Sequence, residues 1–155
     1  MESGQGFWFK STSFEAEDGE DEETNPRMYG RQVAQWVRER FLSAGYPVEE
    51  VIPEDWGWCV MCQREPFSLM IGCVNLKDYE HAQPDDPPPS KDRLLWNAIP
   101  MAETPFLKYI FKRKPDVAPA LAKLESELRA FLESEPTIQL VDASVADSWF
   151  EDASR

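Results

Sequence analysis

The chain has 155 residues, which is the size of one compact domain, and 42% of them are hydrophobic, enough for a folded core. Acidic residues outnumber Lys and Arg by 29 to 16, so the formal net charge is −13. This excess of negative charge argues against direct binding to nucleic acid or to anionic lipid, because both are polyanions.

The N-terminus and the cysteine content indicate a compartment. Residues 1–10 have neither a basic start nor an apolar run of signal-peptide length, and no apolar stretch approaches the roughly 20 residues of a transmembrane helix. The three cysteines are too few, and odd in number, for a disulfide framework. We therefore expect a cytoplasmic protein with reduced thiols and no membrane association.

An opening strand and an acidic loop are predicted at the N-terminus. Residues 6–14 read GFWFKSTSF and alternate so that Phe7, Phe9 and Ser11 face one side. In the following segment, seven of the nine residues from position 15 to position 23 are acidic and none is basic. Such a block repels itself, so we expect a flexible, solvated loop over residues 15–24 that could form a contact surface. Its candidate binding residues are Glu15, Glu17, Asp18, Glu20, Asp21, Glu22 and Glu23.

A long N-terminal helix is predicted from Pro26 to Ala44. Asn25 suits the N-cap, and Pro26 suits the first helical position because its missing N–H would be unpaired there. Gly45 follows as a C′ residue that can adopt a left-handed conformation. One apolar stripe recurs at helical spacing and comprises Tyr29, Val33, Trp36, Val37 and Phe41.

Two neighbouring segments, residues 56–63 and 67–75, predict a hairpin of strands joined at residues 64–66. Both carry apolar residues on both faces, which is typical of central strands covered by a helix on one side. Residues 46–52 form either an additional short strand or only a connection.

Residues 78–92 contain several prolines and acids and predict a loop. Residues 93–101 predict another strand beneath the long helix, and Pro100 is expected to place the end of that strand at or near a sheet edge because proline has no N–H.

The C-terminal part alternates helix and strand signals. Residues 104–114 predict a short helix that stops before Pro115, and a longer helix follows Asp116 and ends before Pro136. Residues 137–141 predict a last short strand, and residues 144–150 a terminal turn that docks its two aromatic side chains.

The pattern C-x2-C, followed by a third cysteine and the single histidine, could form a zinc site. Three thiolates and one imidazole would suit Zn²⁺, but residues three apart in a strand point to opposite faces. Buried free thiols and a solvated histidine are therefore favoured, and no metal or cofactor is expected. The residues concerned are Cys59, Cys62, Cys73 and His81.

The segment EDWGW places Glu54 and Asp55 directly before Trp56 and Trp58. Paired acids beside aromatic rings could bind a small molecule, hold a cation or act as general acid and base. The favoured interpretation is that the acids end a strand while the tryptophans fill space under the long helix. If a ligand site exists, this segment is the first place to look.

Four basic residues cluster in an otherwise acidic chain. They either stabilise the C-terminal end of the short helix or form a partner contact. They are Lys108, Lys112, Arg113 and Lys114.

Two sequence motifs resemble those of a group of small, uncharacterised bacterial proteins. They are N-P-x-x-Y-G, from Asn25 to Gly30, and E-D-W-G-W, from Glu54 to Trp58. The resemblance covers residues 7–75. It implies a bacterial, intracellular α+β domain and carries over no catalytic residue, because no activity is established for the group.

Together these patterns predict a single α+β domain over residues 1–155, with an antiparallel sheet of four to six strands packed against a long N-terminal helix and two further C-terminal helices. The favoured function is that of a non-enzymatic acidic binding or inhibitor protein that engages a basic protein partner, as immunity proteins and nucleic-acid mimics do. The alternative is a small-molecule-binding or enzymatic domain that uses the EDWGW segment.

Overall fold

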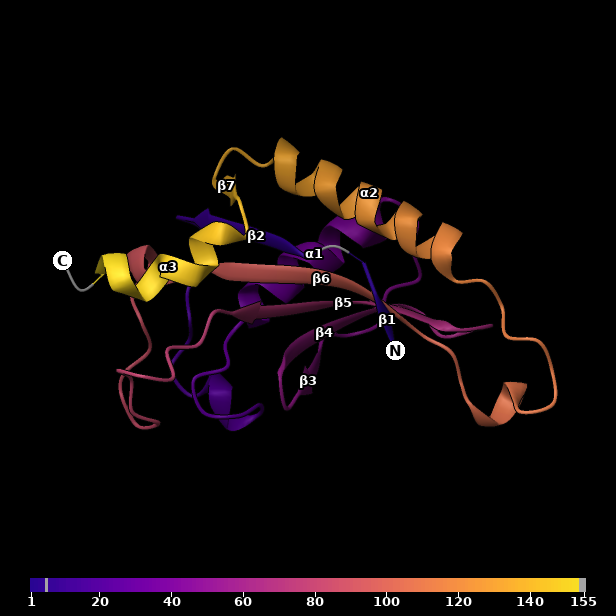
Figure 1. The fold of residues 1–155 in the computed structure, drawn as a ribbon. Helices are drawn as coiled ribbons and strands as arrows, with labels where there is room; N and C mark the ends of the chain where they lie inside the picture. The colour runs from indigo at the N-terminus through magenta and orange to yellow at the C-terminus, as the bar shows by residue number, and fades with distance from the viewer. Residues whose placement is uncertain (5, 154–155) are drawn as a thin grey trace.

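The computed structural model describes residues 1–4 and 6–153 and contains one seven-stranded antiparallel sheet with three α-helices (Figure 1). The α+β class with an antiparallel sheet is confirmed, although the sheet has more strands than the four to six predicted. None of the described helices combines the length and apolar character needed to cross a membrane.

The strands are β1 (Glu2–Ser3), β2 (Phe7–Ser11), β3 (Ile52–Glu54), β4 (Gly57–Gln63), β5 (Ser68–Asn75), β6 (Trp96–Glu103) and β7 (Ile138–Val141). The helices are α1 (Arg31–Ser43), α2 (Ala118–Ser134) and α3 (Ser144–Ala153), with short 3₁₀ turns η1 (Glu20–Glu22), η2 (Lys91–Arg93) and η3 (Leu107–Tyr109).

The sheet joins strands from both ends of the chain. Its order is β3-β4-β5-β6-β2-β7, and β1 pairs beside β2 along the same edge of β6. Strands β4, β5 and β6 are neighbours in the sheet in the same order as in the chain. Strand β2, by contrast, is inserted between β6 and β7. The predicted alternation of β2 is present, since Phe7, Phe9 and Ser11 are all buried.

Both long helices pack on one face of the sheet. Helix α1 lies against β4 and β5, and α2 lies against β6 and β7. The two helices meet where the rings of Phe41 and Phe131 pack edge to face with centroids 5.0 Å apart. The predicted stripe of α1 contributes Val33, Val37 and Phe41 to this core, all fully buried.

The opposite face of the sheet carries a second, smaller apolar cluster. Cys59, Met61 and Met70 are buried there, and the partly exposed Ile52 and Met101 pack against them. The ring of Trp56 lies over Gly72, where an added Cβ would fall 2.8 Å from a ring carbon. We call this surface the open face, because α1 and α2 lie on the other side of the sheet.

The long N-terminal helix predicted from Pro26 to Ala44 is wrong at its start, because α1 begins at Arg31. Arg27 has a left-handed φ of 66°, which interrupts helical geometry. The Asn25 side chain does not cap the helix and instead donates a hydrogen bond to the carbonyl of Asp55 at 2.9 Å. Residues 26 and 27 therefore form a turn, closed by a hydrogen bond from the N–H of Met28 to the carbonyl of Asn25 at 2.9 Å, and lead into a shorter helix.

Pro100 lies inside the sheet rather than at its edge. It pairs with Ile71 of β5, and its carbonyl accepts a hydrogen bond from the N–H of Gly4 at 2.9 Å. Within a strand the N and O atoms of one residue point the same way, so the missing N–H of Pro100 faces the interval between β1 and β2. The break in pairing on this side tolerates the proline.

Two C-terminal elements also differ from prediction. The short helix expected over residues 104–114 is reduced to the single 3₁₀ turn η3. The terminal turn expected over residues 144–150 is instead a ten-residue helix, α3, which is anchored where the Trp149 indole donates to the carbonyl of Arg93 at 3.0 Å.

Candidate functional site

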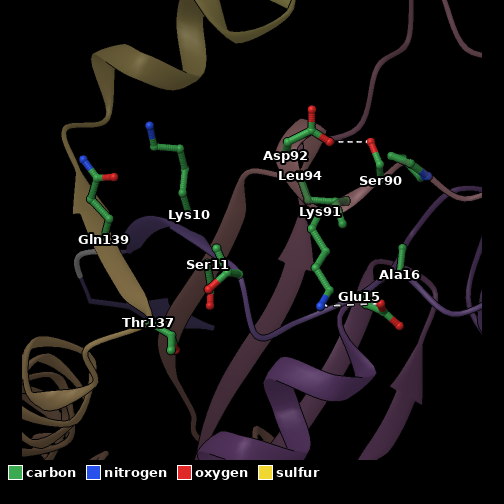
Figure 2. A pocket seen from close by; sticks show the side chains of 12 residues that line it. Lys10, Ser11, Glu15, Ala16, Ser90, Lys91, Asp92, Leu94, Thr137 and Gln139 are labelled. Carbon is green, nitrogen blue, oxygen red and sulfur yellow. Dashed lines mark hydrogen bonds and ion pairs between the residues drawn. The ribbon is translucent and has the colours of Figure 1, made fainter.

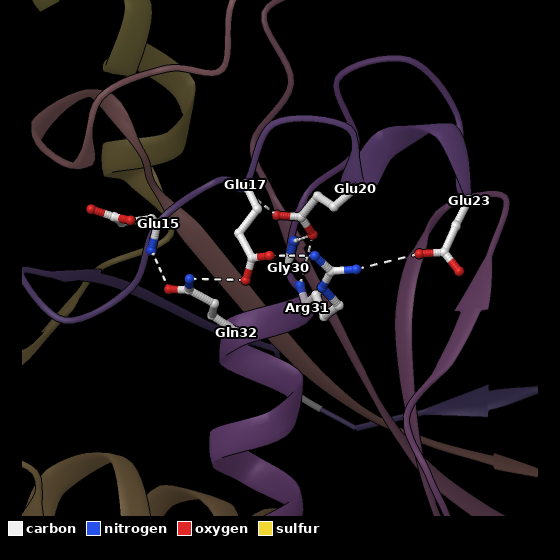
Figure 3. Close-up of polar contacts among 7 residues, drawn as sticks. All are labelled: Glu15, Glu17, Glu20, Glu23, Gly30, Arg31 and Gln32. Carbon is white, nitrogen blue, oxygen red and sulfur yellow. Dashed lines mark hydrogen bonds and ion pairs between the residues drawn. The ribbon is translucent and has the colours of Figure 1, made fainter.

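The acidic segment is held in place by its own carboxylates. Glu20 is only 1% exposed. Its Oε1 accepts a hydrogen bond from the N–H of Glu17 at 2.8 Å, and its Oε2 accepts from the N–H groups of Gly30 and Arg31 at 3.2 and 3.0 Å (Figure 3). A carboxylate from outside the helix thus satisfies N–H groups at the start of α1, where the helix dipole also favours negative charge. Glu20 therefore departs from the expectation that the whole segment is solvated.

Arg31 gathers two more of these acids around the start of α1. Its guanidinium makes a short ion pair with Glu17 and a second one with Glu23 at 3.3 Å. The amide of Gln32 also donates to Glu17, at 3.0 Å (Figure 3). Hydrogen bonds from Gln32 and Arg31 lower the pKa of Glu17. These contacts give Glu17 and Glu23 structural partners within the chain.

The remaining acids of the segment meet a second acidic loop. A hollow of about 390 Å³ lies between residues 18–26 and the proline-rich loop of residues 78–92. Arg27 links the two, because its guanidinium donates to the carbonyls of Asp86 and Pro87 at 3.1 and 3.2 Å. Among the residues that the structure describes, no Lys, Arg or His lines this hollow, which we call the acidic hollow. The carboxylates that line it are Asp18, Asp21, Glu22, Asp85 and Asp86.

The acids of the hollow differ in how far the fold uses them. Asp21 accepts a hydrogen bond from the N–H of Arg27 at 2.7 Å, and Asp86 accepts one from the N–H of Gln83 at 2.8 Å. Asp18, Glu22 and Asp85 are exposed and make no hydrogen bond or ion pair through their side chains with the described part of the chain. Sequence analysis identified each loop but did not pair them, because nothing local connects segments that are 60 residues apart.

The EDWGW segment is divided between the two faces of the sheet. Trp58 is 3% exposed in the main core, with the guanidinium of Arg31 over its ring at 5.5 Å, whereas Trp56 is 39% exposed on the open face. Glu54 and Asp55 are exposed beside Trp56. None of these four residues lines the acidic hollow or the two larger hollows described below.

The three cysteines and the histidine do not come together. Cys59 lies in the cluster on the open face, whereas Cys62 and Cys73 lie in the main core. Burial raises the pKa of both the Cys59 and the Cys62 thiol to about 12, so both are neutral at pH 7. His81 lines a separate hollow of about 430 Å³, with its Nδ1 3.2 Å from a carboxylate oxygen of Asp78. Within residues 1–4 and 6–153, no three His, Cys, Asp or Glu side chains are placed to share a metal ion.

A larger hollow, of about 910 Å³, lies at the end of β2 (Figure 2). Its lining includes Lys10 and Lys91, and Lys91 forms an ion pair with Glu15 at 3.5 Å. Ser11 of β2, Ser90 before η2 and Gln139 of β7 add hydroxyl and amide groups, and Asp92 of η2 adds a carboxylate. Neither cysteine nor histidine is among the described residues that line it. This hollow therefore offers polar contacts but holds no thiol or imidazole for nucleophilic or general-base chemistry. The sequence analysis did not identify it.

Comparison of the chain with protein-family models, with curated proteins and with solved structures found no match.

Proposed function

We propose that this chain is a non-enzymatic binding protein that engages a basic protein partner through the acidic hollow and the carboxylates around it. The observation that carries the proposal is the convergence of two acidic loops from distant parts of the chain on one hollow. No cationic side chain in the described part of the chain lines this hollow. Such an arrangement concentrates negative potential where a Lys or Arg side chain of a partner can enter.

The distribution of acids supports this function. Glu20 is the only buried carboxylate among the side chains that the structure describes, so nearly all of the negative charge faces solvent. Surface charge of one sign steers an oppositely charged partner and accelerates association, and the effect weakens with salt because the Debye length is about 8 Å at physiological ionic strength.

The partner class follows from the same chemistry. Nuclease toxins and nucleic-acid-binding enzymes present clusters of Lys and Arg that neutralise phosphates. Carboxylates held at the rim of a hollow can occupy such a cluster in place of phosphates, which would block access of the nucleic acid. This corresponds to an inhibitor that acts by occupying a surface and needs no reacting group.

The test compares two variants of equal charge. The hollow variant carries Asp18→Asn, Glu22→Gln and Asp85→Asn, whereas the scattered variant carries Glu2→Gln, Glu39→Gln and Glu133→Gln at exposed sites elsewhere. Each variant removes three negative charges and changes the net charge from −13 to −10. A partner captured by the wild-type chain at low salt is identified, purified and titrated against all three proteins.

We expect a basic partner whose Kd rises about tenfold or more with the hollow variant and much less with the scattered variant, because the charge that matters is local. Its Kd with the wild-type chain should also rise steeply with salt. Failure to capture any basic protein at low salt, or equal loss of affinity in both variants, would contradict the proposal.

A further inference from the structure

Residues 104–114, which we call the arm, present apolar side chains directly to solvent. The arm links β6 to α2 and extends beyond one end of the sheet, on the side away from α2 (Figure 1). Phe106, Leu107, Ile110 and Phe111 are 66%, 82%, 51% and 94% exposed. Four large apolar side chains exposed within six residues make a patch that soluble proteins ordinarily reserve for a contact.

Two polar side chains of the arm contact the body of the protein. Lys108 forms an ion pair with Glu65 at 2.5 Å, and the Tyr109 hydroxyl donates to the carbonyl of Pro66 at 3.2 Å. Both contacts are to the turn between β4 and β5. This polarity is the reverse of an ordinary surface segment, in which the apolar side chains would pack inward. The arm is therefore held in a conformation that displays its apolar side chains.

The charge of the arm restricts what can cover it. Lys112, Arg113 and Lys114 are exposed and form no ion pair with the described part of the chain. A complementary surface must therefore be apolar with a negatively charged border, because burying unpaired cations is unfavourable.

The open face of the same chain has this character. Trp56 is 39% exposed there, beside the partly exposed Ile52 and Met101. Glu54 and Asp55 border it, and both are exposed and without an ion pair among the described residues.

Glu54, Asp55 and Trp56 lie at the opposite end of β4 from the arm of their own chain. Asp55 and Trp56 precede β4, whereas the arm contacts the turn that follows β4. The seven residues of β4 separate the two sites by about 23 Å. A two-fold axis parallel to the open face and perpendicular to β4, however, would turn the two open faces toward each other and bring the arm of each copy to the Trp56 end of the other.

We propose that two copies of this chain associate through their open faces as a two-fold symmetric dimer in which each arm docks on the partner copy. Phe111 and its apolar neighbours then cover the region of Trp56, and Lys112, Arg113 and Lys114 meet Glu54 and Asp55. Such an interface is closed and self-complementary, so it ends at two copies. This surface is distinct from the acidic hollow, and its existence does not depend on the proposed function.

The first test is the concentration dependence of mass, measured by sedimentation velocity from about 1 to 500 µM. We expect dimers whose Kd rises about tenfold or more in Phe111→Asp, because an exposed apolar anchor is replaced by a charge. Phe111 is 94% exposed, so this variant should fold, and circular dichroism checks that it does. Tyr79→Asp is the matched control, since Tyr79 is 76% exposed in a different loop and should leave the dimer unchanged.

The second test reverses charges on each side separately and then together. Glu54→Lys with Asp55→Lys should weaken the dimer, and so should Lys112→Glu with Arg113→Glu and Lys114→Glu. Combining all five changes should restore association, because the charges are again complementary in a two-fold pair. Lys123→Glu, at an exposed position on α2, is the control.

Several outcomes would overturn the proposal. A wild-type chain that stays monomeric at 500 µM has no such interface. A dimer that survives both Phe111→Asp and the separate charge reversals uses another surface. Binding of the monomer to vesicles of phosphatidylcholine and phosphatidylglycerol, lost in Phe111→Asp and without dimerisation, would assign the arm to a membrane instead.

Discussion

Glu20 accepts three backbone hydrogen bonds in a site that is 1% exposed, and two of the donors, Gly30 and Arg31, lie at the start of α1. Its carboxylate replaces the cap that the sequence suggested for Asn25. Because Glu20 precedes the first residue of α1 by eleven positions, its side chain also fastens the acidic segment to the core. One residue thus supports both the helix and the loop that forms the acidic hollow.

Replacing Glu20 with Ala should lower the free energy of unfolding by about 2–4 kcal/mol, since three N–H groups lose a charged acceptor. Urea unfolding followed by tryptophan fluorescence measures the change. Glu22→Ala is the control, because Glu22 is exposed in the same segment and should change stability by less than about 0.5 kcal/mol. Equal effects of the two variants would show that Glu20 is not a cap.

The loss of stability caused by Glu20→Ala should change with pH in a defined direction. Burial raises the pKa of Glu20 above its ordinary value of 4.5. In the range from pH 4.5 up to that raised pKa, the native state holds a proton that the unfolded chain has released, so the contribution of Glu20 to stability falls as pH rises. The loss of stability in Glu20→Ala should therefore be larger at pH 4 than at pH 7. A smaller loss at pH 4 would contradict the raised pKa.

At the scale of elements, α1 begins where it does because of how closely its first residues approach β5. Gly30 has a φ of 151°, and a Cβ on it would fall 2.4 Å from the carbonyl oxygen of Cys73. Two hydrogen bonds join Tyr29 and Asn75 beside this contact. The backbone N–H of Asn75 donates to the carbonyl of Tyr29 at 3.1 Å, and the side-chain Oδ1 of Asn75 accepts from the N–H of Tyr29 at 2.9 Å. The entry to α1 is thus tied to the end of β5.

Gly30→Ala should lower the free energy of unfolding by about 3 kcal/mol or more, because both the backbone angle and the contact with β5 exclude a side chain. Gly19→Ala is the matched control. Gly19 also has a positive φ, of 85°, but an added Cβ there meets nothing within 4 Å. Only conformational strain of about 1 kcal/mol should result at that position. Thermal or urea unfolding of both variants measures the difference, and equal costs would refute the role of the β5 contact.

At the scale of the whole molecule, the net charge of −13 opposes the compact state. The ion pairs that relieve it are mostly at the surface, such as Arg38 with Glu50 at 3.2 Å and Arg40 with Glu135 at 3.1 Å, where each contributes little. The convergence of two acidic loops on one hollow adds local repulsion that folding must overcome.

Raising NaCl from 20 to 300 mM should therefore stabilise the chain at low protein concentration. Relief of about 1 kcal/mol of repulsion corresponds to an increase in Tm of roughly 2–4 °C for a domain of this size. This rise in Tm with salt should be smaller in the hollow variant than in the scattered variant, although the two have equal net charge. Differential scanning calorimetry measures the Tm of each protein at both salt concentrations. A Tm of the wild-type chain that stays constant or falls with salt would show that ion pairs outweigh repulsion.

Local patterns in the sequence determined the α+β class, the central hairpin of β4 and β5, the alternation of β2 and the buried stripe of α1, because side-chain periodicity follows directly from backbone geometry. Only the tertiary structure decided that α1 starts at Arg31, that Pro100 lies inside the sheet, that two acidic loops share one hollow and that the apolar side chains of the arm face solvent. Each of these depends on which distant segment supplies a hydrogen-bond partner, a neighbouring strand or a covering surface, and periodicity along the chain contains no information about that choice.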